Sequence, residues 1–144
     1  MANSILLSVK GFEEFTNKLD RMRDSHAMRV RMQNVLLNCA EDIRRLAALN
    51  ASRMFRVKTG NLSKSLHAKP GRTTNPSAYV KAAFRTAPHA HLLEFGHRIV
   101  GHKPRKVYGG KQTEARPFFK SAVTELRAEI RRKIKAEMEQ FLVR

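Results

Sequence analysis

The sequence has almost no cysteine and no long apolar run, and each absence excludes a class of protein. With Cys39 as its single cysteine, the chain has no disulfide framework, and a buried thiol in a helix is the simplest interpretation. No segment approaches the ~20 apolar residues that span a bilayer, and residues 1–15 lack the basic leader and cleavage site of a signal peptide. We therefore expect one soluble domain over residues 1–144, assembled in a reducing cytoplasm.

The chain also lacks the residue patterns of a metal centre or a catalytic site. The crowded segment APHAHLLEFGHRI and the histidine that follows it supply the ligands of a conceivable zinc site: His89, His91, His97 and His102. On a helix, however, the first two would point about 200° apart, and neither a cysteine partner nor an H-E-x-x-H motif accompanies them. Glu94 has no second carboxylate or nucleophile at a recognisable spacing. We predict no catalytic, cofactor-binding or metal-binding residue, and zinc binding is the weaker alternative.

Acidic residues are few, so positive charge dominates the composition. The 29 lysines and arginines exceed the 12 aspartates and glutamates by 17, and the isoelectric point is near 11.1. A charge of this size attracts polyanions and makes copies of the chain repel one another. Charge alone does not choose between DNA, RNA, a membrane surface and an acidic protein, and a functionally silent basic surface is the remaining alternative.

The amino-terminal half is predicted to be mainly helical. A short edge strand over Ser4–Val9 precedes a first helix, whose apolar positions are Phe12, Phe15, Leu19 and Met22. A longer helix is expected from a cap at Ser25 to about Phe55. Its apolar stripe consists of Met28, Met32, Val35, Leu36, Cys39, Ile43, Leu46 and Ala47.

The rest of the chain is predicted to add a small sheet and a second long helix. Strands over Leu62–Ala68 and Tyr79–Arg85 flank the loop Lys69–Ser77, and a short helix over Ala87–Phe95 ends at Gly96. The basic segment His97–Glu114 is either a long hairpin or an arm. Pro117 then opens an amphipathic helix of about six turns that reaches Phe141. These elements predict an α+β fold, in which a small antiparallel sheet is packed by the two long helices.

The short motifs are interpreted as structural elements. Glycines 60 and 96 would reverse the chain, with positive φ at Gly96, while Thr59 and Asn61 would bond to the local backbone. Glu94 would pair with one of the many cations nearby. The apolar members are expected to be buried together: Leu62, Leu66, Leu92, Phe95 and Phe118.

Three motifs occur in order along the chain: KTGNLSKSL, HAHLLEFGH and ARPFFKSAV. Together they resemble the bacteriophage tail-component and neck family typified by the tenth gene product of a lambda-like phage, to which the minor tail protein Z group is also similar. That family has T-G-x-L-x-x-S-aliphatic, Y-A-x-x-x-E-F-G-T and R-P-F-aliphatic-x-x-A patterns. The matching positions are Thr59, Gly60, Leu62, Ser65, Leu66, Ala90, Glu94, Phe95, Gly96, Arg116, Pro117, Phe118 and Ala122. The chain departs from the patterns at His89, where tyrosine is usual, and at His97, where threonine is usual.

The resemblance implies a virion protein with no catalytic residues. Such proteins act as completion, terminator or neck components, forming a ring at the head–tail junction or the top of the tail. The implied partners are further copies of the chain in a hexamer or dodecamer, and connector and tail-tube proteins. DNA passing through the ring is a further candidate, and no membrane partner is implied. The expected location is the virion, after assembly in the host cytoplasm.

The basic segment is the expected contact with a partner, because no acidic residue occurs between His97 and Lys111. Its candidate interface or DNA-facing residues are Arg98, Lys103, Arg105, Lys106 and Lys111. The alternative is a small basic nucleic-acid-binding protein that uses this segment and the arginines of the long helix against phosphates. Tyr108 is the only aromatic residue in the segment, so a base-stacking platform is poorly supported.

Overall fold

The computed structural model describes residues 16–21, 25–55, 60–98 and 112–143. Residues 16–21 are helical, and six further elements follow. In chain order these are α2 (His26–Met54), α3 (Asn61–Ser65), β1 (Leu66–Pro70), β2 (Ala78–Ala82), α4 (Ala90–Phe95) and α5 (Phe118–Val143). The predicted strand over Ser4–Val9, the positions Phe12, Phe15 and Met22, and most of the segment His97–Glu114 lie outside the described residues.

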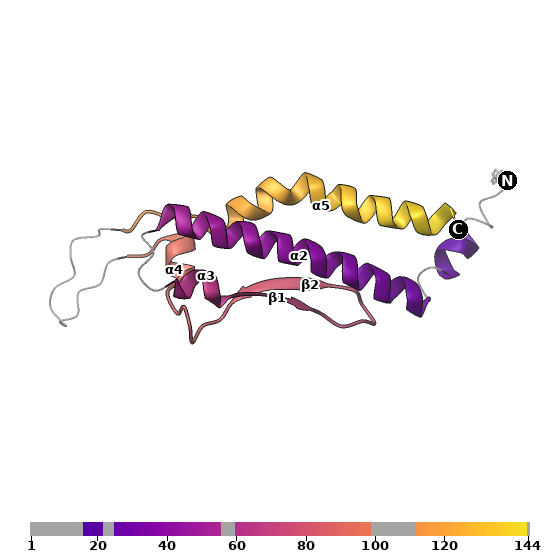
Figure 1. The fold of residues 1–144 in the computed structure, drawn as a ribbon, viewed down its shortest axis with the longest axis horizontal. Helices are drawn as coiled ribbons and strands as arrows, with labels where there is room; N and C mark the ends of the chain where they lie inside the picture. The colour runs from indigo at the N-terminus through magenta and orange to yellow at the C-terminus, as the bar shows by residue number, and fades with distance from the viewer. Residues whose placement is uncertain (1–15, 22–24, 56–59, 99–111, 144) are drawn as a thin grey trace, which may run out of the picture.

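The molecule is elongated and has three layers (Figure 1). Helix α2 forms the middle layer, with α5 packed antiparallel along one side and the β1–β2 hairpin on the other. The short helices α3 and α4 lie near the carboxyl end of α2, close to the start of α5. This arrangement confirms the predicted α+β fold, in which two long helices pack a small antiparallel sheet.

Helix α2 begins and ends where the sequence predicts. The Ser25 hydroxyl accepts a hydrogen bond from the Met28 N–H at 3.3 Å, and the chain becomes extended at Phe55. Small side chains dominate the buried part of the helix: Cys39, Ala40, Ala47 and Ala51. Because these side chains are short, layers can approach α2 closely on both sides.

The start of the predicted first strand is wrong, because residues 61–65 form the single-turn helix α3. Gly60, at φ 69°, accepts the Lys64 N–H at 3.1 Å, and the Ser65 hydroxyl donates to the Leu62 carbonyl at 2.6 Å. These local bonds occupy groups that a strand would need for a partner. Strand β1 therefore starts only at Leu66.

The second strand is shorter than predicted. It pairs antiparallel with β1 from Leu66↔Ala82 to Pro70↔Ala78, so Lys69 and Pro70 belong to the hairpin rather than to the predicted loop. After β2 the chain turns over residues 84–86, where the Thr86 N–H donates to the Ala83 carbonyl at 3.1 Å. The turn at the other end of the hairpin is fixed to α2, since the Gln33 side chain bonds both the N–H and the carbonyl of Ser77.

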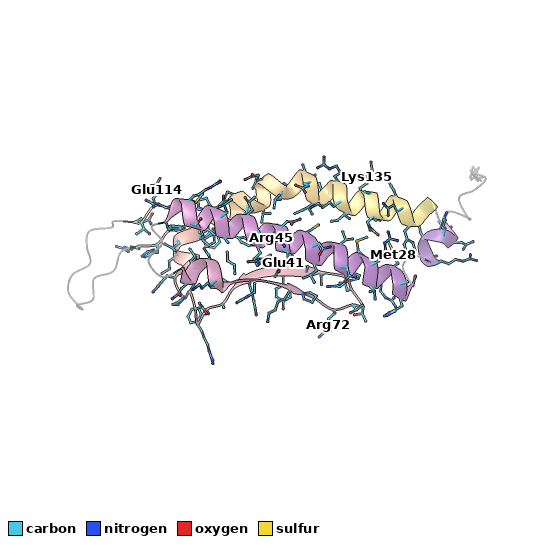
Figure 2. The ribbon with its side chains drawn as sticks, in the orientation of Figure 1. Met28, Glu41, Arg45, Arg72, Glu114 and Lys135 are labelled. Carbon is cyan, nitrogen blue, oxygen red and sulfur yellow. The ribbon has the colours of Figure 1, made fainter. Side chains whose placement is uncertain are left out.

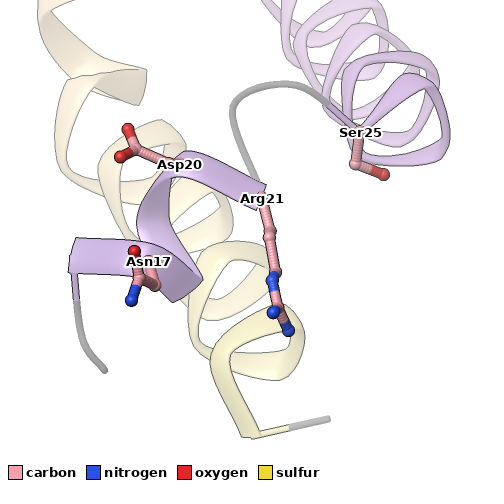
Figure 3. A pocket seen from close by; sticks show the side chains of 4 residues that line it. All are labelled: Asn17, Asp20, Arg21 and Ser25. Atoms are coloured by element: carbon pink, nitrogen blue, oxygen red, sulfur yellow. The ribbon is translucent and has the colours of Figure 1, made fainter. Parts of the chain in front are cut away.

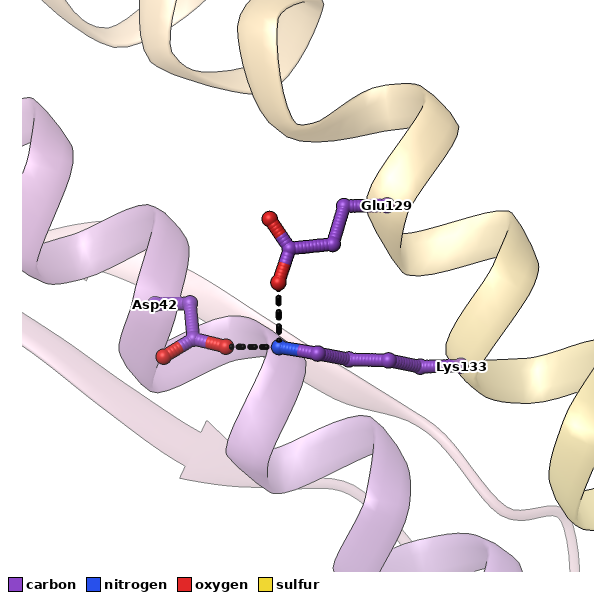
Figure 4. Close-up of polar contacts among 3 residues, drawn as sticks. All are labelled: Asp42, Glu129 and Lys133. Atoms are coloured by element: carbon purple, nitrogen blue, oxygen red, sulfur yellow. Dashed lines mark hydrogen bonds and ion pairs between the residues drawn. The ribbon is translucent and has the colours of Figure 1, made fainter.

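Ion pairs connect α2 and α5 along their exposed edge. Lys133 of α5 lies 2.8 Å from both Asp42 of α2 and Glu129 of its own helix (Figure 4). Hydrogen bonds to these two carboxylates raise the pKa of Lys133 above its usual value. Further along the same edge, Arg31 pairs with Glu137.

Candidate functional site

The three motifs meet at the carboxyl end of α2, where they share one core. Its buried residues come from three layers: Ala47, Ala51, Leu66, Phe118 and Ala122. Leu62 and Leu93 are half-buried against this cluster. The prediction that the apolar motif residues are buried together is therefore confirmed for Leu66 and Phe118, whereas Leu62 is half-buried against the cluster and Leu92 is half-buried outside it.

Phe95 contradicts the predicted core. Its side chain is 77% exposed, although its neighbour Glu94 is buried. Successive residues of a helix are rotated by about 100°, so a helix as short as α4 that turns Glu94 inward directs Phe95 away from the core. The apolar character of Phe95 made it resemble a core residue, but its position on the helix places it on the surface.

Glu94 caps α5 rather than pairing with a cation. One carboxylate oxygen accepts the Phe119 N–H at 2.9 Å, and the other accepts the Lys120 N–H at 2.8 Å. Both donors belong to the first turn of α5, whose N–H groups have no partner within the helix. The partial positive charge of the helix end thus takes the place of the expected cation. None of the ion pairs found among the described residues includes Glu94.

Gly96 places α4 directly against the segment that leads into α5. It has φ 70° and ψ 165°, a region that only glycine adopts readily. A Cβ atom at this position would lie 2.5 Å from the Thr113 carbonyl oxygen and 3.1 Å from the Ala115 nitrogen. The predicted positive φ is confirmed, and the close approach of two backbones is a second reason for glycine here.

The two ends of segment 99–111 lie side by side. Arg98 and Gln112 form an antiparallel bridge, and the Thr113 N–H donates to the His97 carbonyl at 2.8 Å. The Thr113 hydroxyl also accepts the His97 N–H at 2.9 Å. The residues at which the chain enters and leaves segment 99–111 are therefore held together, next to Gly96.

Arg116 ties three elements together. Its guanidinium donates to the Met54 carbonyl at the end of α2 at 3.0 Å and lies over the Phe55 ring. Its own N–H donates to the Leu93 carbonyl of α4 at 3.0 Å. The Phe55 ring in turn meets Phe118 edge-to-face, with ring centroids 6.0 Å apart.

Ser65, Ala90 and Ala122 are buried. Pro117 directly precedes α5, as predicted. The exposed Arg98 lies at the base of the basic segment. The remaining predicted site residues lie outside the described residues: Thr59, Lys103, Arg105, Lys106 and Lys111.

Two buried polar residues of α2, one at each end of the helix, were not predicted. Asn50 donates to the Phe118 carbonyl at 3.4 Å and to the Ser121 hydroxyl at 3.1 Å, and Gln33 holds the hairpin turn. Both are buried, next to an apolar stripe. A polar side chain at such a helix position is the signal that could have found them, because buried amides need partners.

An open hollow of about 220 Å³ lies beside Phe95, and we call it the α4 groove. Its mainly apolar wall is formed by residues of both strands, α4 and the start of α5: Leu66, Val80, Ala82, Ala90, Phe95, Phe118 and Phe119, with Lys81, His91 and Glu94 as its polar members. A different hollow, near residues 16–21, is lined by polar side chains, of which Asp20 and Arg21 point away from each other (Figure 3). The α4 groove is thus suited to an apolar side chain rather than to a polar ligand.

The histidines do not come together in the described structure. His89, His91 and His97 are exposed, His97 contacts Thr113, and His102 lies outside the described residues. Across residues 16–21, 25–55, 60–98 and 112–143, no three His, Cys, Asp or Glu side chains lie close enough to hold a metal ion. The buried carboxylate of Glu94 uses both oxygens to cap α5, so the geometry favours a structural role for it.

Comparison with known proteins gives a match to a protein-family model. The model of the HK97-gp10-like family, whose description reads "Bacteriophage HK97-gp10, putative tail-component", matches residues 13–96, which is more than half of the chain. The first two motifs lie inside this range and the third, around Arg116 and Pro117, lies beyond it. No curated protein and no solved structure matches. In the part of the chain that is described, no helix could cross a membrane. The chain therefore belongs to the HK97 gp10-like family of bacteriophage tail components and is a protein of the phage particle.

Proposed function

We propose that this tail component is a non-enzymatic joint protein that forms a ring at the head–tail junction or the top of the tail. In such a ring it would act as a completion, terminator or neck component. The observation that carries the proposal is the exposed Phe95 beside the α4 groove. Both lie where α4 and Gly96 pack against the start of α5, a region that the three motifs hold in place and that we call the α4 corner.

Rigidity of the corner supports a docking role. Glu94 caps α5, Gly96 brings two backbones together, and Arg116 joins α2 to α4. These polar groups are satisfied within the chain, so the corner offers a partner apolar surface rather than reactive groups. A rigid, exposed aromatic side chain is the kind of anchor that dominates the energetics of protein interfaces.

The corner carries both a projection and a hollow. Phe95 projects from α4, while the α4 groove is concave and mainly apolar. Phe95 also forms part of the groove wall, so the two features adjoin each other. If Phe95 of one copy enters the groove of the next and the contact repeats head to tail, the copies close into a ring where the rotation allows. We infer that Phe95 contacts a neighbouring subunit, and that the basic segment 97–114 contacts that subunit or an acidic face of the next ring.

The test is a comparison of two exposed phenylalanines. Phe95→Ser should abolish ring formation and head–tail joining with little change in melting temperature, because Phe95 contributes little to the core. Phe84→Ser is the matched control, since Phe84 is 72% exposed and does not line the α4 groove. Sedimentation velocity and electron microscopy would detect rings, and a lysate lacking the wild-type protein would report joining. Rings that survive Phe95→Ser, or equal losses in both variants, would contradict the proposal.

A further inference from the structure

Acidic residues are absent from most of the middle of the chain. Between Asp42 and Glu114 the only acidic residue is Glu94, whereas lysines and arginines recur throughout that stretch. Glu94 is buried and caps α5, so its charge is already used. The hairpin and both short helices are built from this stretch. The lysines and arginines on their surfaces therefore have few acidic residues near them in the sequence.

The outer surface of the hairpin collects part of this charge. Alternate residues face away from α2 and are exposed: His67 and Lys69 on β1, and Tyr79 and Lys81 on β2. We call these four residues the basic sheet face. Lys69 lies directly opposite Tyr79, and His67 lies opposite Lys81. Opposed side chains are about 5 Å apart, and alternate residues on a strand are about 7 Å apart.

Within the described residues, no ion pair or hydrogen bond joins Lys69 or Lys81 to an acidic group. The contrast with the opposite layer is clear, because Lys133 of α5 contacts two carboxylates. Positive charges that crowd one face of a strand pair repel each other and weaken the hairpin. A polyanionic partner on this face would relieve that repulsion.

The chemistry of the face distinguishes DNA from an acidic protein. The cores of protein interfaces are depleted in lysine and rich in apolar and aromatic groups. Most of the α4 groove is apolar and aromatic, with Lys81 among the residues that line it. The basic sheet face instead has lysines around one tyrosine, and both side chains are donors that contact phosphate oxygens. A two-stranded ribbon also fits the major groove of B-form DNA, which is about 12 Å wide.

We propose that the basic sheet face binds the phosphate backbone of double-stranded DNA, without regard to sequence. Lys69 and Lys81 contact phosphates, and the Tyr79 hydroxyl donates to a phosphate oxygen. The proposal does not require the ring, because DNA affinity is measured on the isolated chain. Lys81 also lines the α4 groove, whereas Lys69 and Tyr79 are not among the residues that line it.

Two variants with equal charge loss test the proposal. The first is Lys69→Gln with Lys81→Gln, and the matched control is Arg127→Gln with Arg131→Gln on exposed positions of α5. The control residues belong to α5, which packs on the side of α2 opposite the hairpin. Figure 2 shows the separation of these two layers by the labels Arg72, at the hairpin turn, and Lys135, on α5. Because both variants lose two positive charges, any difference between them reports contact rather than total charge.

The measurement is fluorescence anisotropy of a labelled 30-base-pair duplex with the full chain at several KCl concentrations. We expect the sheet variant to bind roughly ten-fold more weakly at 100 mM KCl, with a slope of log affinity against log salt that is smaller by about two. The α5 variant should stay within about two-fold of wild type if it loses no phosphate contact. Lys69→Arg with Lys81→Arg should restore wild-type affinity, and all variants should melt at similar temperatures.

Three outcomes would overturn the proposal. Equal weakening by the sheet and α5 variants would indicate attraction by total charge alone. If the sheet variant keeps wild-type DNA affinity, the basic sheet face does not contact DNA. Loss of binding to labelled poly-glutamate with unchanged DNA affinity would identify an acidic protein as the partner. Phe95→Ser should leave DNA affinity unchanged, so failure of the ring proposal can be told apart from failure of this one.

Discussion

At the scale of single residues, the three neighbours Glu94, Phe95 and Gly96 of the E-F-G motif have three different roles. Glu94 caps α5, Gly96 allows two backbones to approach, and Phe95 stays exposed between them. The first two tasks fix the position of the third residue. An aromatic side chain on a fixed backbone loses little conformational freedom when a partner binds it, which favours its use as an anchor.

Glu94→Ala should destabilise the fold. The change leaves the Phe119 and Lys120 N–H groups without their acceptor and removes a negative charge from the positive end of α5. We expect a loss of about 2 kcal/mol in the free energy of unfolding, measured by urea denaturation. Glu94→Gln, which keeps one oxygen acceptor, should lose less. Equal stability of Glu94→Ala and wild type would show that the cap is unimportant.

Two glycines with positive φ, Gly60 and Gly96, allow strain and steric clash to be separated. Gly60 and Gly96 have φ 69° and 70°, but a Cβ atom at Gly60 would meet only Lys64 Cε at 3.8 Å. Gly60→Ala should therefore cost about 1 kcal/mol from backbone strain. Gly96→Ala should cost roughly 3 kcal/mol, because ψ 165° is unfavourable for alanine and Thr113 lies in the way. Thermal and urea unfolding of both variants would check the order, and a smaller loss at Gly96 would contradict it.

At the scale of elements, sequence patterns predicted the long helices well because each carries its own signals. Helix α2 has the Ser25 cap and an apolar stripe, and α5 follows Pro117. The prediction failed at α3, where a strand was expected to start at Leu62 and local hydrogen bonds favour a helical turn instead. The exposure of Phe95 could not be predicted either. In a helix of six residues the periodicity is too short to show which side faces the core.

Glu94 was recognised as a motif residue, but its partner was not. Its cap joins residues 25 and 26 positions apart, and that contact exists only once α4 and α5 pack together. Gly96 was placed correctly because positive φ is a local property. Its contact with Thr113 is a tertiary one and leaves no local signal in the sequence.

Replacement of the basic segment should leave the fold intact. Because Arg98 pairs with Gln112, replacing residues 99–111 with Asn-Gly leaves a two-residue hairpin connection of a favoured type. The simple deletion of Val100–Gly110 leaves a connection of the same length. We expect either chain to melt within about 5 °C of wild type, since no residue of the core cluster is removed.

The same variants should fail to assemble if the segment contacts a neighbour. Sedimentation velocity should then show monomers, and electron microscopy should show heads without joined tails. Changing Lys103, Arg105 and Lys106 together to Glu should weaken assembly in a salt-sensitive way. Normal assembly of the shortened chain would exclude the segment from the interface.

At the scale of the whole molecule, positive charge opposes both folding and self-association. The net charge of +17 is carried by 144 residues, and the ion pairs between α2 and α5 are partly exposed. Exposed pairs contribute little to stability, so repulsion dominates the electrostatics of the folded chain. A ring of such subunits therefore needs counter-charge from its partners, which assembly onto DNA and acidic protein surfaces would supply.

Salt should stabilise the isolated chain for the same reason. Raising NaCl from 10 to 200 mM shortens the screening length and weakens repulsion, so the melting temperature should rise by about 3–6 °C. The variant with Lys69→Gln and Lys81→Gln should show a smaller rise, because it starts with less positive charge. A melting temperature that falls with salt would mean that the ion pairs, rather than the excess of charge, govern stability.

The thiol of Cys39 can report when α5 separates from α2. The thiol is buried at the middle of α2, near Lys133 and Asp42 where α5 packs, and burial raises its pKa. Little thiolate is present at neutral pH and reagents cannot reach it, so modification must wait until α5 separates from α2. The rate at which a disulfide reagent labels this single site thus times the separation of two layers, in the free protein and after assembly, without an introduced probe.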